Sequence, residues 1–408
     1  MEKKAILVVV DGLGDRSVKE GKTPLQLTPK KHLDDLAKRG STGIMSTLGR
    51  GIIPGSDTAH LALFGYDINR YYKGRGPFEA LGVGIDLKEG DVAFRCNFAT
   101  VDKDGRVIDR RAGRLKDEGK ELAKSLQGIE VEGVKVIFSS STEHRGVLVL
   151  RGEGLSPEIS DTDPHTAESL PFKEARPLKN DERAKRTAKI VNEIVKRSQE
   201  ILSSHPLNKE REEEGKLPAN IILTRGAGIY QKIPSLKEKY GFSSCCIAGA
   251  ALYKGVAKYV GMEVLEVPGA TGRIDTDIEA KARESKKALK TFDFVFIHIK
   301  GADNASHDGN LRDKMLMIQK VDRLVELLRE EEENAYLIVT ADHSTPLSLK
   351  RHSSDPVPLM IYGPGIRQDK VELFDEISTS SGCLGHLKGV ELMKVIVDLM
   401  GCSHMVGS

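Results

Sequence analysis

A chain of 408 residues is too long for one ordinary hydrophobic core, so we expect two domains or three. The 62 Lys and Arg residues against 60 Asp and Glu give a formal net charge of +2, which argues against a nucleic-acid-binding surface. The apolar run at 5–10 is far shorter than the apolar region of a signal peptide or a membrane span, so we expect a cytoplasmic protein with no membrane contact.

Three apolar runs have the length and the β-branched content of buried parallel strands: 5–10, 294–299 and 335–340. Helical periodicity is found at 311–334 and again at 390–400. Strands that alternate with helices predict an α/β fold, in which helices sandwich a mostly parallel sheet.

The middle of the chain has a different pattern. Two short apolar segments, 134–140 and 146–152, are close enough in sequence to form a β-hairpin. A charged helix is expected at about 181–202, and the charged stretch 203–220 is interpreted as a solvated loop.

This change of pattern predicts how the domains are divided. We expect a core domain formed by both ends of the chain, 1–91 and 269–408. An α+β domain, residues 92–268, would be inserted into it.

Acidic and histidine side chains gather after the three predicted strands. In open α/β sheets, ligands bind beyond the carboxyl ends of the strands. Asp11 follows the first strand, and Asp303 and His307 follow the second, spaced so that they share one face of a helical turn. The segment after the third strand supplies the remaining candidates: Asp342, His343 and His352.

Oxygen and imidazole groups in this mixture suit manganese, zinc, cobalt or iron better than calcium, and these six residues are enough for two ions. Each has a plainer explanation when taken alone. Asp11 could cap a helix, and Asp303 and His307 could be surface residues without a function. Their coincidence at strand ends favours a two-metal site.

The segment IIPGSDTAHL, residues 52–61, places a serine after a Pro-Gly turn. A hydroxyl beside two cations loses its proton more readily, which would make Ser56 a nucleophile able to attack phosphorus or sulfur. Without metals, Ser56 is better explained as a turn or N-cap serine, and Thr58 is the rival hydroxyl. His60 is interpreted as a packing residue or one that lies behind the site.

The order of these motifs resembles the alkaline phosphatase superfamily: Asp, then Ser in GSDTAH, then DxxxH, then ADH and a last His. More closely, the chain resembles the archaeal type of cofactor-independent phosphoglycerate mutase, nearly from end to end. The segments that carry this resemblance are VVVDGLGD, GSDTAHLALFGYD, YYKGRGPFEALGVGIDL, FRCNFAT, DTDPH, IKGADNASHDG and TADHSTP.

The resemblance implies that the ligands are divided between two divalent metal ions. Manganese is favoured, with cobalt, zinc and magnesium as alternatives. One ion would be held by Asp303, His307 and His352. The other would be held by a second group: Asp11, Asp342, His343 and the oxygen of Ser56.

The resemblance also implies the reaction. A phosphoryl group would move between the 2- and 3-hydroxyls of glycerate through a phosphoserine at Ser56, without bisphosphoglycerate, in glycolysis and gluconeogenesis. The partner would be this small-molecule substrate, and the resemblance leaves open whether the chain forms an oligomer.

In this family the inserted domain is a cap that binds the substrate. Bidentate arginine suits both the phosphate and the carboxylate. Asp163 and His165 of DTDPH could hold the glycerate hydroxyls. The candidate positive groups are Arg95, Arg110, Arg114, Arg145, Arg225 and Lys254.

Three other functions are weighed against the mutase. A phosphatase or phosphodiesterase would keep the metal site and let water accept the phosphoryl group. Phosphopentomutase differs mainly in the sugar and usually uses threonine as nucleophile, which Ser56 disfavours. A metal-stabilised structural protein would need neither Ser56 nor an arginine-rich cap, and structural zinc prefers cysteine.

Overall fold

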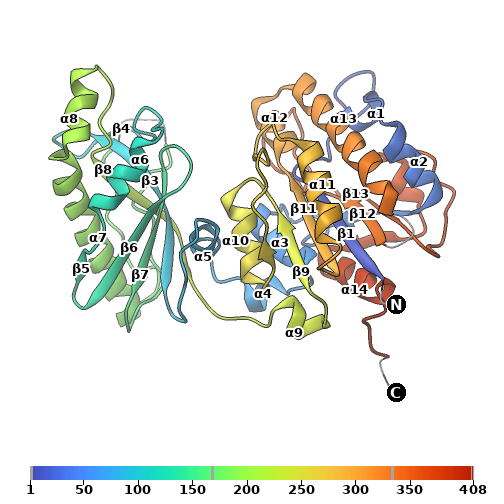
Figure 1. Ribbon diagram of the computed structural model, residues 1–408. Helices are drawn as coiled ribbons and strands as arrows, with labels where there is room; N and C mark the ends of the chain where they lie inside the picture. The colour runs from blue at the N-terminus through green and yellow to red at the C-terminus, as the bar shows by residue number, and fades with distance from the viewer. Residues whose placement is uncertain (1–2, 167–169, 332–334, 406, 408) are drawn as a thin grey trace. The chain divides into compact units, whose positions relative to one another are not determined.

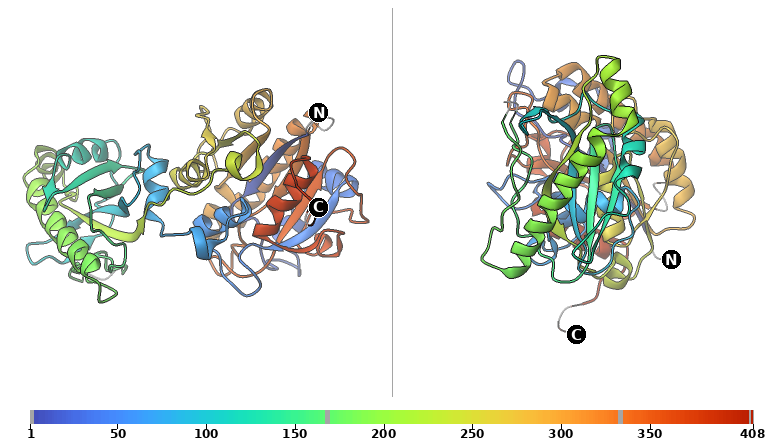
Figure 2. Two further views of the ribbon diagram at one scale, coloured as in Figure 1. Left: turned by 90° about the horizontal axis from the view of Figure 1, so that it is seen from below. Right: turned by 90° about the vertical axis from the view of Figure 1, so that its left-hand side faces the viewer.

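The computed structural model describes residues 3–166, 170–331, 335–405 and 407. The chain divides into two compact units. Unit 1 comprises Met1–Tyr72 and Ile233–Ser408, and unit 2 is the continuous segment Lys73–Lys232. In Figures 1 and 2, unit 2 is the part coloured from light blue to yellow-green.

Within the described residues, unit 1 contains an eight-stranded sheet with the order β10-β9-β11-β1-β12-β13-β2-β14. β1 lies between β11 and β12 and is parallel to both, whereas β13 is antiparallel to its neighbours β12 and β2. The strands are β1 Lys4–Val10, β2 Ser41–Ser46, β9 Ser244–Ile247, β10 Glu263–Val264, β11 Phe294–Ile299, β12 Ala335–Thr340, β13 Val357–Tyr362 and β14 Gly385–Lys388. This confirms the predicted α/β fold with a mostly parallel sheet.

The central strands have the predicted bounds, because β11 and β12 coincide with the predicted segments and β1 is one residue longer. Every residue of β11 and β12 is buried, which requires helices on both faces of the sheet. The helices of unit 1 are α1 Pro24–Leu27, α2 Lys31–Arg39, α3 Ser56–Leu63, α4 Ile68–Tyr71, α9 Leu236–Tyr240, α10 Ala251–Tyr259, α11 Ile278–Ala288, α12 Gly301–Asp308, α13 Leu311–Leu328, α14 Gly389–Leu399 and the short 3₁₀ helices η1 Arg329–Glu331 and η2 Ser378–Ser381.

The long helical pattern predicted for 311–334 forms α13 and η1, and its last three residues, 332–334, lie outside the described part of the chain. Asn310 caps α13, because its side chain accepts a hydrogen bond from the backbone N–H of Asp313. The buried face of α13 includes Ile318, Val321 and Val325, as its apolar periodicity predicts.

Unit 2 contains an antiparallel sheet with the order β4-β3-β7-β6-β5, in which β8 also pairs with β3. β6 and β7 form the predicted hairpin. The elements are β3 Val92–Val101, β4 Val107–Asp109, β5 Glu130–Val131, β6 Val134–Ser140, β7 Arg145–Arg151 and β8 Ile221–Ile229, with helices α5 Gly76–Gly82, α6 Glu118–Ser125, α7 Glu182–Ser203 and α8 Pro206–Glu213. α7 corresponds to the predicted charged helix and contributes apolar residues such as Ile194 to the same core as Phe98 of β3.

The interpretation of 203–220 as a solvated loop was wrong, because α8 lies within it. The side chain of His205 caps this helix by accepting from the backbone N–H of Leu207. Asn208 is buried, and its amide donates to the carbonyls of Leu202 and Ala219 at 2.8 and 3.0 Å. The charged residues concealed this helix because its buried side chains, those of Asn208 and Arg211, are polar.

The inserted segment also differs from the predicted 92–268. Residues 73–91 belong to unit 2, where α5 packs on β3 and β8. Residues 233–268 belong to unit 1, because β9 pairs in parallel with β11 and α10 packs on α3. β9 has only four residues, which is too short to stand out from a sequence as a core strand.

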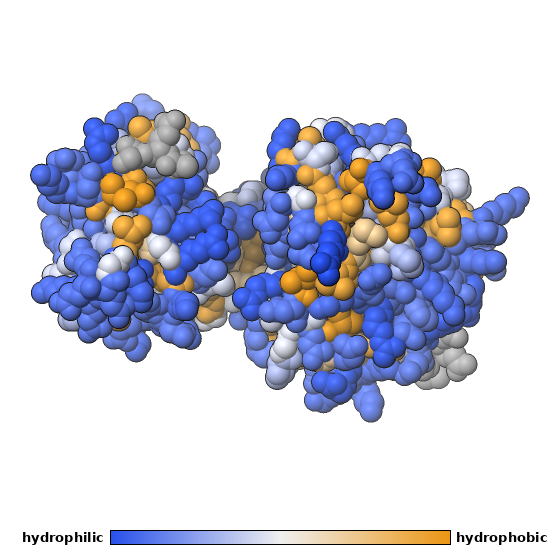
Figure 3. Space-filling model, turned by 90° about the horizontal axis from the view of Figure 1, so that it is seen from above, coloured by the Kyte–Doolittle hydropathy of each residue, from blue (hydrophilic) through white to orange (hydrophobic). Residues whose placement is uncertain are grey.

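Hydrophilic residues cover most of the molecular face shown in Figure 3, with smaller apolar areas on both units. This matches a chain in which 30% of residues are charged. Among the described residues, none of the helices combines the length and the apolar character that a membrane crossing needs.

Candidate active site

The ends of three neighbouring strands bring the predicted site residues of unit 1 together. Asp11 follows β1, and its backbone N–H donates to the carbonyl of Ile299, the last residue of β11, at 2.8 Å. Asp342 follows β12 on the other side of β1. Because these three strands are parallel, the segments that follow them meet at one edge of the sheet.

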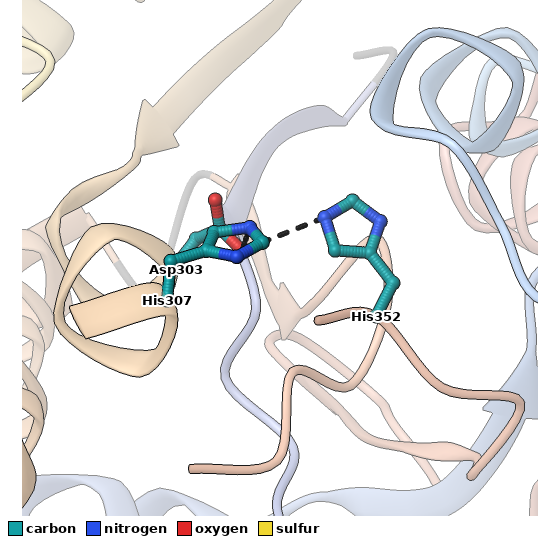
Figure 4. Close-up of side chains that lie close together, drawn as sticks. All are labelled: Asp303, His307 and His352. Atoms are coloured by element: carbon teal, nitrogen blue, oxygen red, sulfur yellow. Dashed lines mark ion pairs between the residues drawn. The ribbon is translucent and has the colours of Figure 1, made fainter. Parts of the chain in front are cut away.

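The first group of candidate ligands is Asp303, His307 and His352, drawn in Figure 4. Asp303 and His307 lie four positions apart on α12, and His352 comes from the loop between β12 and β13. The Nε2 atoms of His307 and His352 lie 3.3 and 3.7 Å from Oδ1 of Asp303. Suitable donor atoms of all three residues lie within 4.8 Å of one another.

Both histidines of this group are oriented by backbone carbonyls. Nδ1 of His307 lies 2.8 Å from the carbonyl oxygen of Lys350, and Nδ1 of His352 lies 2.8 Å from that of Pro54. Donation from Nδ1 to a carbonyl leaves Nε2 as the acceptor, which is the arrangement found for many metal-binding histidines.

The second group is Asp11, Asp303 and His343, whose donor atoms also lie within 4.8 Å of one another. His343 Nε2 lies 3.4 Å from Oδ1 of Asp11 and 3.1 Å from Oδ2 of Asp342. Asp303 is therefore close enough to take part in either group, whereas the family resemblance implies a place for it in the first group alone.

The donor atoms fit divalent cations. Oδ1 of Asp11 and Oδ2 of Asp342 are buried and have no hydrogen-bond partner among the described residues. An unpaired buried carboxylate oxygen is unfavourable unless a cation or a hydrogen-bond donor compensates it. Burial alone would raise the pKa of Asp303, but the hydrogen bond to His307 and the charge of Lys300 hold it well below its usual value.

Ser56 lies beside the second group. It is the first residue of α3, is 7% exposed, and its Oγ lies 3.2 Å from Nε2 of His343. The rival hydroxyl is directed elsewhere, because Oγ1 of Thr58 donates to the carbonyl of Gly55 at 3.0 Å. The N-terminus of α3 places backbone N–H groups near Ser56, which favours negative charge there.

His60 is fully buried. From the sequence, we interpreted it as a packing residue or as a residue that supports the site from behind. Its Nδ1 lies 2.7 Å from the carbonyl oxygen of Ser56, one helical turn earlier. Its ring also contacts the rings of Tyr253, Phe296 and His298.

Three residues around Asp11 were missed by the sequence analysis. Tyr253 donates a hydrogen bond to Oδ2 of Asp11, and Lys300 Nζ lies 3.1 Å from the same oxygen. Nε2 of His298 lies 3.2 Å from it, and the His298 ring stacks on that of Tyr253. A lysine directly after a buried strand, as in IKGAD, was the available signal for Lys300, whereas Tyr253 lay in the segment assigned to the inserted domain.

In unit 2, adjacent strands bring several predicted arginines onto one face of the sheet. Arg95 of β3 is directly opposite Arg225 of β8, and Asn97 of β3 is opposite Arg145 of β7. Like charges placed opposite one another are destabilising unless an anion lies between them. Burial and Arg75 lower the pKa of Arg95 to about 9, and Nε of Arg225 is buried without a hydrogen-bond partner among the described residues.

The DTDPH motif of unit 2 contacts another predicted arginine. Arg110 binds Asp163 through two hydrogen bonds of 2.6 and 2.7 Å. His165 has a positive φ of 61°, and its Nε2 lies 2.7 Å from Oδ2 of Asp161. Arg114 is exposed and has a positive φ of 62°.

Lys254 belongs to α10 of unit 1 and not to the inserted unit, which corrects its predicted position. Its Nζ lies 2.8 and 2.6 Å from the two carboxylate oxygens of Glu266. Its sequence neighbour Tyr253 binds Asp11, so α10 contributes to the surroundings of the metal-ligand groups.

Known proteins similar to this chain cover its full length. The family model described as 2,3-bisphosphoglycerate-independent phosphoglycerate mutase matches residues 37–208. The enzyme of that name from Methanocaldococcus jannaschii is 48% identical, with 99% of each chain covered. The enzyme from Methanococcus aeolicus is 49% identical and covers 99% of this chain and 100% of its own.

Solved structures give the same result. A protein from Pyrococcus horikoshii superposes with a TM-score of 0.87 at 36% identity, and all of both chains is covered. The cofactor-independent phosphoglycerate mutase from Thermoplasma acidophilum superposes with a TM-score of 0.72 at 37% identity, covering 98% of this chain and 100% of that one. The chain therefore belongs to the family of 2,3-bisphosphoglycerate-independent phosphoglycerate mutases.

Proposed function

We propose that this protein interconverts 2-phosphoglycerate and 3-phosphoglycerate by transferring the phosphoryl group through Ser56, a step of glycolysis and gluconeogenesis. The observation that carries this proposal is the position of Ser56. Its hydroxyl lies 3.2 Å from His343, at a helix N-terminus and next to carboxylate and imidazole groups that suit divalent metals. Membership of the phosphoglycerate mutase family supports phosphoglycerate as the substrate.

The candidate ligands would hold two metal ions. Asp303, His307 and His352 would hold one ion. Bound divalent cations would favour the ionised serine hydroxyl and neutralise charge on the phosphoryl group. Manganese is the proposed metal, with cobalt, zinc and magnesium as alternatives. The other ion would be held by Asp11, Asp342, His343 and Ser56.

The chain's own residues would then perform the transfer. Ser56 Oγ, having lost its proton, forms a bond to phosphorus while the bond from phosphorus to the substrate oxygen breaks, and that oxygen gains a proton. The glycerate then offers its other hydroxyl, which loses its proton and takes the phosphoryl group from Ser56. No bisphosphoglycerate enters this sequence.

Unit 2 would supply the groups that bind the substrate's anionic ends. The face that carries Arg95, Arg145 and Arg225 has a concentration of positive charge. Glu79 offsets part of it through an ion pair of 3.2 Å with Arg95, and the anionic groups of the substrate would stabilise the rest. Asp163 is already bound by Arg110 and by the backbone N–H of His165, so it can orient Arg110 as well as accept from a glycerate hydroxyl.

One experiment tests the mutase directly against a phosphatase. Protein loaded with manganese is incubated with 3-phosphoglycerate alone, and 2-phosphoglycerate and free phosphate are measured together. We expect 2-phosphoglycerate to form without added bisphosphoglycerate and to exceed free phosphate. Phosphate as the main product would show that water accepts the phosphoryl group and would overturn the proposal.

A further inference from the structure

Lys300 lies between two candidate metal ligands. It is the residue after β11 and directly precedes α12. Its Nζ lies 2.8 Å from Oδ2 of Asp303 and 3.1 Å from Oδ2 of Asp11. The Lys300 side chain is 22% exposed, against 3% for Asp303 and 0% for Asp11. One ammonium group therefore bridges two buried carboxylates.

The two oxygens of each carboxylate have different surroundings. Oδ1 of Asp11 lies 3.4 Å from His343, and Oδ1 of Asp303 lies 3.3 Å from His307, so both Oδ1 atoms face imidazoles. Both Oδ2 atoms face Lys300. The lysine thus contacts the carboxylates on the side away from His307 and His343, and it does not occupy the position between these two imidazoles and the carboxylates. On Asp11 it shares Oδ2 with His298, whose Nε2 lies 3.2 Å from that oxygen.

Two carboxylates in one buried site repel each other and are costly to remove from water. A positive group within hydrogen-bond distance of both carboxylates offsets their mutual repulsion and the cost of removing them from water, because Coulomb attraction is strong where water is excluded. The ring of Tyr253 lies 5.5 Å from the Lys300 ammonium, and the Tyr253 hydroxyl donates to Asp11. The immediate surroundings of Lys300 are therefore suited to one fixed cation.

We propose that Lys300 compensates the charges of Asp11 and Asp303 when no metal ion does so. This inference rests on the proposed metal site. A bound divalent ion would supply the same compensation from the imidazole side. Loss of the Lys300 charge should therefore destabilise the metal-free protein more than the metal-bound protein. Loss of a metal ligand would have the opposite effect, because a ligand stabilises the protein through the bound ion.

The test compares melting temperatures of the full chain in EDTA and in manganese. Lys300→Met keeps most of the length of the side chain and removes its charge, and Lys300→Arg keeps a charge. Lys320→Met is the matched control, because the ammonium of Lys320 lies on α13 and bonds to the backbone carbonyls of Ile274 and Thr276. Manganese content per chain is measured after dialysis for every variant.

We expect Lys300→Met to lower the melting temperature in EDTA by at least about 3 °C more than in manganese, so that the stabilisation by manganese increases. Lys300→Arg should recover most of the loss in EDTA. Lys320→Met should change both temperatures equally. The manganese content of Lys300→Met should equal that of the unaltered chain.

Two results would overturn the role of Lys300: equal losses of melting temperature in EDTA and manganese, including no loss in either, or a lower manganese content in Lys300→Met. The unaltered chain distinguishes these results from failure of the metal site itself. If manganese neither binds to the unaltered chain nor raises its melting temperature, the proposed metal site is wrong, and the Lys300 proposal fails with it.

Discussion

The Oγ atom of Ser56 lies 3.2 Å from Nε2 of His343, although 287 positions separate the two residues in sequence. The pair joins the start of α3 to the segment that follows β12. It distinguishes Ser56 from Thr58, whose hydroxyl is bonded to the backbone of its own turn.

Replacing Ser56 with alanine should abolish mutase turnover and leave a folded protein that still binds metal. The transfer needs an oxygen at this position, so we expect a decrease in kcat of more than about 1,000-fold. Thr58→Val is the control, since it removes a hydroxyl two positions away and should retain activity. Substantial turnover by Ser56→Ala would transfer the nucleophile assignment to Thr58.

Removing metal should abolish activity, and manganese or cobalt should restore it. His307→Ala and His352→Ala each remove one ligand of the group that contains Asp303, so elemental analysis should show a loss of about one ion per chain in either variant. His205→Ala is the comparison, because His205 caps α8 in unit 2 and should leave the metal content unchanged. Unchanged metal in both His307→Ala and His352→Ala would refute the grouping.

Neutralising Arg225 or Lys254 should change the partition of the phosphoryl group. If these residues retain glycerate while Ser56 carries the phosphoryl group, their loss lets water compete, and the ratio of free phosphate to isomerised product rises beyond any increase in KM. Arg225→Gln and Lys254→Met are compared with Arg183→Gln, which alters an exposed arginine of α7. A constant ratio with reduced rate would show that these two residues do not retain the glycerate.

Lys314→Met should destabilise unit 1 by about 3–5 kcal/mol, because it leaves a buried carboxylate without its cation. Nζ of Lys314 lies 2.8 Å from Oδ2 of Asp15, and both side chains are fully buried. The same ammonium donates to the carbonyls of Gly14 and Thr345, which belong to the segments after β1 and β12. Urea unfolding measures the loss.

A double substitution checks the cause of that loss. Adding Asp15→Asn to Lys314→Met removes the uncompensated charge and should recover part of the free energy of unfolding. If the ion pair were unimportant, the losses in free energy of unfolding caused by the two single substitutions would add in the double variant.

His144 should make the stability of unit 2 depend on pH. Burial, together with Arg145 and Arg111, lowers the pKa of His144 to about 4, from 6.5 in the unfolded chain. The unfolded chain therefore binds the proton first, so the contribution of neutral His144 is complete above about pH 6.5 and is lost as pH falls toward 4.

His144→Gln removes this titration. Between pH 7 and pH 4.5, the free energy of unfolding should fall by roughly 1–3 kcal/mol less in the variant than in the unaltered chain. Parallel pH profiles of the two proteins would show that His144 is not the group responsible.

The elements that could be predicted from the sequence are those whose residues all have the same degree of burial. β11 and β12 are buried along their whole length, so an unbroken apolar run identifies them. β13 was not predicted, because Pro358 interrupts the pattern that a central strand would show, yet it lies between β12 and β2.

The site was predictable to the extent that its residues follow strand ends. Asp11 and Asp342 do so, and their convergence follows from the parallel order of the strands. Lys300 and Lys314 were not singled out, because a lysine is usually exposed and only the tertiary structure shows the carboxylates that surround it. The opposition of Arg95 and Arg225 depends on strand register across many residues, which no local pattern specifies.

The place of β1 in its sheet has a consequence for the order of events during synthesis. Ala5 pairs with Phe294 on one side and Tyr336 on the other, so β1 leaves the ribosome nearly 300 residues before its first neighbour and cannot pair until that part of the chain has been made. Unit 2 is one continuous segment whose strands pair with each other. We therefore expect the nascent chain to fold its middle first and its beginning last, with the slow step set by the closure of very long loops.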